Sequence, residues 1–450
     1  MVNSTVKTKT LTVKNKRLSQ VNPNVAGIDI GAKSIFVCAG LADGTQLVRE
    51  YSTFTVDLQS MAHWLKECGT KSVAMESTGI YWIAPYDILS AAKFEVLLVN
   101  PKSIKAINRK KTDTLDCQWI QELHSYGLLK GSFRPDDQGV TFRGYVRQRS
   151  RLIKDSGIHQ QLMHKALSQM NVQLGQVLSD IAGTTGLLII RAIVGGERDP
   201  KNLAKLRHSN CRRKEADIEK ALCGNYRSEL VFALKQALEA YDFFQAQITL
   251  CEQEIRKLLE TWEGKEGDTV EFDTDLGDHK KIAFELEKIL GVDLTKVPGL
   301  EARLLMQVIS EIGTDMSRWP SAKHFVSWLG LCPDNKISGG KILDSRTRPV
   351  ANKAAQALRM AANSLYRSKT FLGAFLRRMR ARRDVAKAIT ATAHKLAIII
   401  YTMISEKKQF IEFGQDAYEQ KYRERAIAKL KRKAVELGFS IVPNQQNIPA

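Results

Sequence analysis

Four acidic residues occupy positions from which carboxylates could act on a phosphodiester. Asp29 lies inside an apolar segment, between Ile28 and Ile30, and Glu76 ends a second short apolar segment. Both segments have the length and composition of buried strands. A carboxylate in such a place is costly to bury unless it is paired or binds a cation. If the two strands are neighbours, both carboxylates emerge at one edge of the sheet.

Asp113 and Asp116 stand three residues apart at the beginning of a predicted helix. At that spacing their Cβ atoms lie about 5 to 6 Å apart on one helix face. They are also in the first turn, where the helix dipole favours anions, and Thr112 is the expected N-cap. Any one of the four acids alone would more commonly cap a helix or pair with a lysine.

Four carboxylates that converge repel one another unless cations bind between them. Hard oxygen ligands select Mg²⁺ or Mn²⁺. Two such ions about 3.5 to 4 Å apart activate the attacking oxygen and stabilise the leaving oxygen of a phosphodiester. The sequence therefore predicts a metal site and phosphodiester chemistry at Asp29, Glu76, Asp113 and Asp116.

The chain has 450 residues and a formal net charge of +20. Such an excess indicates a polyanionic partner, nucleic acid before a membrane surface. No run of about eighteen apolar residues appears, and the basic N-terminus lacks the apolar core of a secretory signal. We therefore expect no membrane association and a cytoplasmic location. The seven cysteines include no C-x-x-C pair, so we expect neither a zinc site nor a disulfide framework.

The apolar pattern of the N-terminal part predicts a mixed α/β sheet with helices on its faces. Residues 25–41 predict a buried strand, which a turn at Asp43-Gly44 joins to a second strand paired with the first. The other predicted elements are a helix at 57–68, a strand ending at Glu76, a helix interrupted near Pro85, a strand at 95–100 and a helix from Asp113.

The rest of the chain has helical spacing. Residues 141–178 and 227–263 are two long amphipathic stretches that would form an antiparallel coiled coil, although core helices would have the same pattern. The acidic residues 264–281 read as a connector. A Pro-Gly turn then opens a helix, and a loop leads to another helix from Ser321. Such a helix–hairpin–helix shape commonly binds a DNA backbone through its amides.

Three motifs in the N-terminal part resemble those of the DEDD insertion-sequence transposases, the Piv-like recombinases: G-I-D-I-G-A-K, M-E-S-T-G-I-Y-W and K-K-T-D-T-L-D. The resemblance implies a RuvC-like, ribonuclease-H-type domain that holds magnesium through Asp29, Glu76, Asp113 and Asp116. Further motifs resemble those of the second domain of the same family: V-P-G followed by S-E-I-G, then F-V-S-W-L-G-L-C-P, and then S-G-G-K. There the resemblance implies that Ser338 is the nucleophile.

A serine that attacks a DNA phosphate keeps the bond energy in a phosphoserine, so strands can be rejoined without an external energy source. The expected nucleic-acid contacts are Lys111, Gly339, Lys341, Arg346, Arg348 and Lys353. The family resemblance further implies double-stranded donor and target DNA, a guide non-coding RNA, and dimers that assemble into tetramers.

Five regions are expected along the chain. They are a basic disordered arm at 1–24, a RuvC-like catalytic domain at 25–145, a helical coiled-coil region with an insertion at 146–289, a mostly α-helical transposase domain with the serine at 290–407, and a charged helical tail at 408–450.

Three other functions compete with recombination. A RuvC-type metal-dependent nuclease would hydrolyse DNA and leave Ser338 as a bystander. An actin-like ATPase or sugar kinase would need a second phosphate loop and an adenosine motif, and the sequence has neither. A catalytically inactive DNA-binding regulator would have no need of the four acids.

Overall fold

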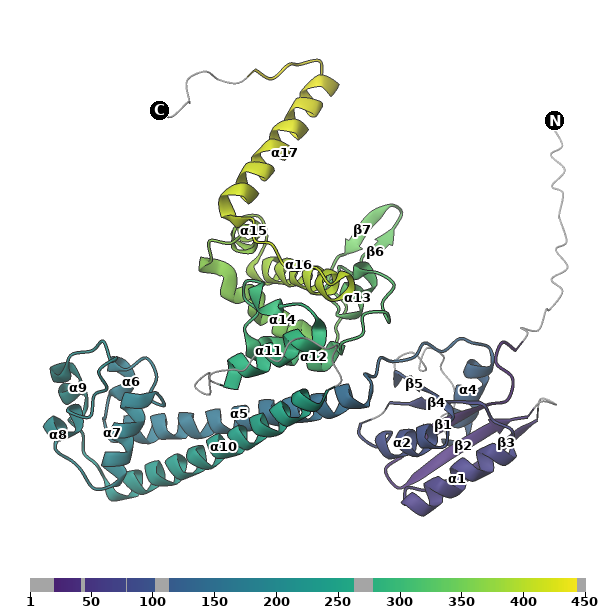
Figure 1. The fold of residues 1–450 in the computed structure, drawn as a ribbon, viewed down its shortest axis with the longest axis horizontal. Coiled ribbons are helices and arrows are strands. Elements are labelled where there is room, and N and C mark those ends of the chain that lie inside the picture. Colours follow the sequence, from purple (N-terminus) through teal and green to yellow (C-terminus); the bar gives the residue numbers. More distant parts are fainter. Residues whose placement is uncertain (1–19, 42–44, 78, 102–112, 263–277, 443–450) are drawn as a thin grey trace, which may run out of the picture. The chain divides into compact units, whose positions relative to one another are not determined.

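The computed structural model describes residues 20–41, 45–77, 79–101, 113–262 and 278–442. The chain divides into two units, one up to Arg134 and one from Pro135. Figure 1 labels the elements of both units, which are described here one at a time.

The first unit is built on a five-stranded sheet of order β3-β2-β1-β4-β5. Its strands are β1 (Val25–Ile30), β2 (Ser34–Gly40), β3 (Gln46–Ser52), β4 (Ser72–Glu76) and β5 (Glu95–Val99). β2 pairs antiparallel with β1 and β3, whereas β4 pairs parallel with β1 and β5. The predicted mixed α/β sheet is confirmed.

Helices cover both faces of this sheet. On one face α1 (Thr55–Glu67) and α2 (Ile83–Ala91) share a core with every second residue of β1, including Ile28 and Ile30. On the other face α4 (Asp113–Ser125) packs through Ile120 against Ala74 and Val99. Because side chains alternate along a strand, the odd-numbered residues of β1 and the even-numbered residues of β4 face α4.

Two local predictions differ from the structure. Residues 25–41 form two strands, because Gly31–Lys33 make a tight turn in which the Gly31 amide donates to the Ser34 carbonyl over 3.0 Å. The predicted partner of β3 is therefore only the second half of this segment, because β3 pairs with β2 and not with β1. The predicted turn at Asp43-Gly44 lies outside the described residues. The helix α2 is not interrupted at Pro85, since that proline lies in its first turn, where no helical amide bond is lost.

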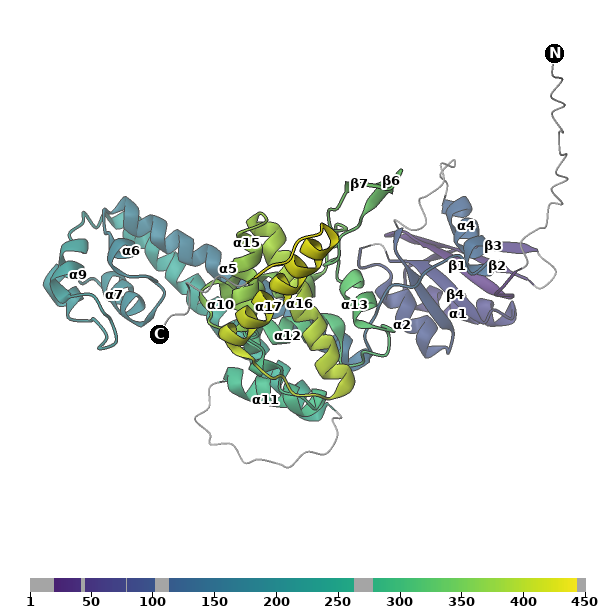
Figure 2. The ribbon, with the colours of Figure 1, turned by 90° about the horizontal axis from the view of Figure 1, so that it is seen from above.

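The second unit begins with two long antiparallel helices, α5 (Asp137–Gln169) and α10 (Ser228–Thr261), which lie side by side in Figures 1 and 2. The Arg149 guanidinium donates to the Glu252 carboxylate over 2.8 Å, and Gln245 donates to Ser156 over 2.8 Å. The predicted antiparallel packing of the two stretches agrees with these contacts. Their supercoiling as a coiled coil stays a prediction.

The chain between these two helices forms a small helical module, residues 170–227, which we call the tip module. It contains α6 (Leu174–Val177), α7 (Thr184–Val194), α8 (Pro200–Ala204) and α9 (Glu215–Ala221). Its apolar residues form a core of their own together with the adjoining ends of α5 and α10, for example Ile190 with Met163 and Leu234.

The C-terminal part of the second unit is mostly helical. Its helices are α11 (Asp278–Leu290), α12 (Ala302–Ile312), α13 (Ala322–Trp328), α14 (Lys353–Ser364), α15 (Phe371–Arg380), α16 (Val385–Glu406) and α17 (Gly414–Glu436), with 3-10 turns η1 (Leu294–Lys296) and η2 (Leu365–Arg367). A hairpin of β6 (Lys336–Ser338) and β7 (Lys341–Asp344) lies between α13 and α14.

In the described part of the chain, α16 is the one helix long and apolar enough to cross a membrane by length and composition. It packs against α13, α14 and α15, and the buried residues on it include Leu396 and Ile400. A core helix of a folded domain passes the same test.

Candidate active site and nucleic-acid interface

Asp29 and Glu76 are neighbours on the same face of the sheet. β1 and β4 run parallel, and Gly27 pairs with Ala74 and Ile28 with Met75. Continuing this register by one residue sets Asp29 beside Glu76, on strands about 4.8 Å apart. Both side chains lie on the α4 face, because each is two residues beyond one that contacts α4: Gly27 in β1 and Ala74 in β4.

Gly27 lets α4 approach β1 closely. A Cβ atom at Gly27 would lie 2.2 Å from the Gln121 amide nitrogen and 2.4 Å from the Cys117 carbonyl oxygen. Both are helix backbone atoms, which cannot move aside as a side chain could. The helix therefore packs directly on the strand at Gly27, two residues before Asp29.

The direction of α4 brings its N-terminus to the two acids. Its C-terminal end lies at the start of β4, where Ser72 Oγ and His124 Nε2 are 2.8 Å apart. Glu76 is about 13 Å further along the strand at about 3.3 Å per residue. Since a helix rises about 1.5 Å per residue, this length equals about nine helical residues. Counting back from His124 reaches the level of Asp113 and Asp116.

The structure thus brings Asp29, Glu76 and the first turn of α4 to one edge of the sheet. Asp113 begins α4, but its side chain lies outside the described part, as do Thr112 and Lys111 altogether. Asp116 is half-buried in the first turn. Among the side chains that are described, no three of His, Cys, Asp or Glu are close enough to hold one metal ion.

The donors at this edge suit a hard cation. Burial, aided by Cys38 and the Asp29 carboxylate, raises the pKa of the neighbouring Cys117 thiol to about 12. Without a bound cation the thiol is therefore protonated at neutral pH. The remaining donors are carboxylate oxygens, the ligands of Mg²⁺ and Mn²⁺. Asp29, Glu76, Asp113 and Asp116 are the residues that would hold such an ion.

Ser338 lies at the tip of the β6–β7 hairpin. It pairs across the hairpin with Lys341, and Gly339 and Gly340 form the turn between them. The two glycines have φ angles of +53° and +76°, which is the left-handed backbone that a two-residue hairpin turn requires. Directly opposed side chains have Cβ atoms about 4.5 to 5.5 Å apart, so the lysine stands beside the serine on one face of the hairpin.

The predicted phosphate-binding residues of this region are exposed and lie along one connected segment. Gly339 and Lys341 are at the hairpin tip, Arg346 is at its base, and Arg348 donates to the Ser327 carbonyl of α13 over 3.2 Å. Lys353 begins α14. The one nearby histidine in sequence, His324, has its Nδ1 atom 2.8 Å from Ser321 Oγ in the first turn of α13.

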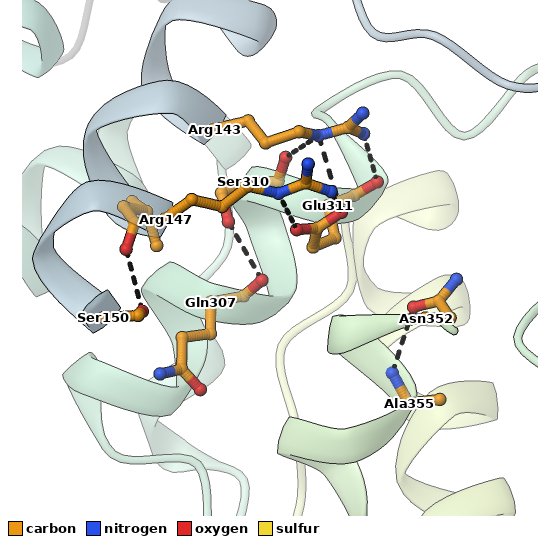
Figure 3. A network of polar contacts seen from close by, with 9 residues as sticks. Arg143, Arg147, Ser150, Gln307, Ser310, Glu311, Asn352 and Ala355 are labelled. Carbon is orange, nitrogen blue, oxygen red and sulfur yellow. Dashed lines mark hydrogen bonds and ion pairs between the residues drawn. The ribbon is translucent and has the colours of Figure 1, made fainter. Parts of the chain in front are cut away.

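A cluster of charged residues ties α5 to α12. Arg147 donates two hydrogen bonds to the Glu311 carboxylate, of 2.8 and 2.9 Å, and Arg143 donates to the Ser310 and Glu311 carbonyls over 3.0 and 2.8 Å (Figure 3). Glu311 is 7% exposed. It belongs to the S-E-I-G motif, so this motif joins the C-terminal helices to the long helical pair of α5 and α10.

Sequence reasoning missed two positioning residues. A glycine inside an apolar strand signals close backbone approach, and Gly27 could have been recognised on that ground. Glu311 offered no such signal, because its arginine partners are more than 160 residues away.

Two family models match parts of the chain. A family model described as "Transposase", of the IS110 DEDD type, matches residues 26–172. A second, described as "Transposase IS116/IS110/IS902 family", matches residues 293–376. No curated protein matches the chain. The first match contains the sheet and all four acids, and a ribonuclease-H-type fold is consistent with the observed sheet. The second contains the serine hairpin. The chain therefore belongs to the IS110 family of insertion-sequence transposases.

Proposed function

We propose that this DNA transposase cuts and rejoins strands through a 5′-phosphoserine at Ser338, with Mg²⁺ or Mn²⁺ held by Asp29, Glu76, Asp113 and Asp116. The observation that carries the proposal is the position of two acids, side by side on the sheet, at the level of the first turn of α4. Asp29 and Glu76 occupy one face of adjacent parallel strands, and the N-terminus of α4 lies at their level. The bound metal supplies Lewis-acid stabilisation of charge on the phosphate oxygens.

The fold would hold the acids in position before DNA binds. The strands that carry Asp29 and Glu76 are central in the sheet and covered on both faces, so their backbones have little freedom. The helix dipole of α4 offsets part of the repulsion between Asp113 and Asp116. Such preorganised charge needs no rearrangement at the moment of reaction.

The serine step is a transesterification. Ser338 Oγ attacks the scissile phosphorus and loses its proton, the bond from phosphorus to the 3′ oxygen breaks, and that oxygen takes up a proton. In the second step a 3′ hydroxyl of another strand attacks the phosphoserine, and Ser338 regains its proton. Lys341, beside the serine on the hairpin, binds a non-bridging oxygen of the attacked phosphate.

The partners are double-stranded donor and target DNA, a guide non-coding RNA, and further copies of the chain in a homodimer that assembles to a homotetramer. We expect the protein to act in the bacterial cytoplasm, at the nucleoid. RNA from protein purified out of its native host should be enriched in sequence flanking its own gene. Recovery of random RNA alone would contradict the guided reaction.

The covalent step is tested by trapping. Wild-type protein, Ser338→Ala and the control Ser345→Ala, an exposed serine just past the same hairpin, are incubated with 3′-radiolabelled DNA and Mg²⁺ and denatured. The adduct should form with wild type and control and disappear in Ser338→Ala. An adduct that persists in Ser338→Ala would refute the serine assignment.

The metal site is tested by the same assay. Asp29→Asn and Glu76→Gln should remove Mg²⁺-dependent cleavage, whereas Glu50→Gln, an exposed acid on β3, should not. Full activity of Asp29→Asn would contradict the metal site. Cleavage without any adduct in the wild type, abolished by Asp29→Asn, would favour the RuvC-type nuclease.

A further inference from the structure

The tip module carries a strongly basic segment that the active site does not use. Residues 201–214 contain six basic residues and no acidic residue. We call these residues the basic segment. It leads from α8 to the start of α9, and its basic residues are Lys201, Lys205, Arg207, Arg212, Arg213 and Lys214.

These six charges are not neutralised within the described part of the chain, since none of them lies within ion-pair distance of a carboxylate there. Other arginines of the module behave differently. Arg191 pairs with Asp242 over 2.6 Å, and Arg227 pairs with Glu229. Arg198 donates to the Glu197 carbonyl over 2.7 Å and lies over the Tyr226 ring. These three arginines thus have partners within the protein, whereas the basic segment keeps its positive charge.

The basic segment is held in a defined shape. The Arg207 guanidinium donates to the carbonyls of Cys211 and Arg213 over 2.8 and 2.9 Å, which closes the loop between them. The His208 amide donates to Thr185 Oγ1 over 3.1 Å and fixes the loop to α7. Exposed charges on an ordered loop lose little conformational entropy when a ligand binds.

The surface beside the loop is hollowed. A hollow of about 720 Å³ is lined by Arg212 and Arg213 together with polar groups that include Ser179, Asn210 and Thr184. Its one acid, Asp180, accepts hydrogen bonds from the Gln160 amide group and the Ala182 backbone amide. The lining thus offers hydrogen-bond donors and positive charge, which suit phosphate and sugar oxygens.

We propose that the basic segment binds the sugar–phosphate backbone of duplex DNA. The segment has no Phe, Tyr or Trp, so it lacks the stacking platform that single strands require. The flanking helices α8 and α9 have five and seven residues, and neither is long enough to read bases from a groove. Contact with phosphates alone positions a duplex without selecting its sequence.

The length of α5 sets how far along a duplex the proposed contact would lie from the C-terminal helices. Arg147 contacts Glu311 of α12, and Met163 is in the core of the tip module. The two residues are sixteen positions apart, which corresponds to about 24 Å of helix. A duplex that follows α5 would reach the tip module about seven base pairs beyond the C-terminal helices. The module would then hold DNA that flanks the site of strand exchange.

The test measures the salt dependence of DNA binding by the full chain. Wild type and Arg212→Ala/Arg213→Ala/Lys214→Ala are titrated with a 40-base-pair duplex of mixed sequence in EDTA, over a series of salt concentrations. Each phosphate contact contributes about 0.9 to the log–log slope, so the variant should lose about 2 to 3 from the slope. Binding in EDTA depends on neither the metal nor the serine, so its outcome is independent of the proposed strand-exchange mechanism.

A control of equal charge separates contacts from net charge. Lys235→Ala/Lys257→Ala/Lys408→Ala removes three lysines that are each in an ion pair, and the slope should change by less than about 1. A second variant, Lys201→Ala/Lys205→Ala, leaves the Arg207 contacts intact and should lose about 1 to 2.

Wild-type slopes in both tip variants, with unchanged circular dichroism, would overturn the proposal. A loss confined to a 40-base-pair RNA duplex would also overturn it and assign the segment to RNA.

Discussion

The contact between Gly27 and α4 makes one substitution unusually informative. In Gly27→Ala the added methyl group would lie 2.2 Å from the Gln121 amide nitrogen and 2.4 Å from the Cys117 carbonyl oxygen. Ordinary van der Waals contact begins near 3.4 Å. Because both neighbours belong to the helix backbone, the strain is relieved only if α4 moves away from β1.

The required movement can be estimated from these distances. The helix must withdraw by about 1 Å, and overpacking of a filled interior costs about 1 to 3 kcal/mol. The same withdrawal moves the first turn of α4, with Asp113 and Asp116, away from Asp29 and Glu76. A displacement of about 1 Å in a catalytic site can lower the rate about 100-fold. The substitution should therefore lower activity far more than it lowers stability.

The assay compares Mg²⁺-dependent DNA cleavage with unfolding in urea. Gly144→Ala is the matched control, because a Cβ atom at that position in α5 meets nothing within 4 Å. Alanine there should be neutral or stabilise the helix by about 1 kcal/mol. Gly27→Ala should stay folded at 20 °C and cleave at about 1% of the wild-type rate.

Wild-type cleavage by Gly27→Ala would refute the reasoning, since α4 would then not rest on β1 as described. Equal losses of activity and of folded protein would show that the substitution acts through unfolding alone. That result would contradict the expectation that the position of α4 sets the catalytic rate.

Three further outcomes are expected. Glu311→Ala leaves Arg143 and Arg147 without their carboxylate and should lower the free energy of unfolding in urea by about 3 kcal/mol; an unchanged value would contradict the junction of α5 and α12. Gly339→Ala puts a side chain on a backbone with φ of +53° in open space, so adduct formation should fall while the melting temperature stays constant. Burial raises the pKa of Cys38 and Cys117 to about 12, so at pH 8 iodoacetamide should label the exposed Cys223 and leave these two unmodified in mass spectra.

The acid-bearing strands could be predicted because their apolar residues leave few alternatives. Ile28 and Ile30 had to be buried, and alternation then sends Asp29 to the opposite face. What the sequence left open was the order of strands, and with it the pairing of β1 with β4. Residues 25–41 read as one strand because β1 and β2 are both covered by helices, so neither shows the polar alternation that marks an exposed face.

The position of α4 depends on long-range contacts that no local pattern contains. Gln121 lies against Gly27, and His124 lies against Ser72. These contacts set which end of the helix meets the carboxylates. The spacing of Asp113 and Asp116 predicted that they share one helix face, but only the packing of the helix brings that face to the edge of the sheet.

The acids and the serine differ in how firmly the chain holds them. Asp29 and Glu76 stand on central strands whose neighbours are fully buried, so any movement would disrupt the core. Ser338 stands on a hairpin whose tip is exposed on every side, and its turn depends on two glycines with left-handed backbone. The fold therefore holds the acids in place before DNA binds, whereas we expect the hairpin to gain its final position from contacts with the substrate. In the proposed reaction, binding energy from parts of the DNA remote from the scissile bond would then contribute to the rate of the serine step as well as to affinity.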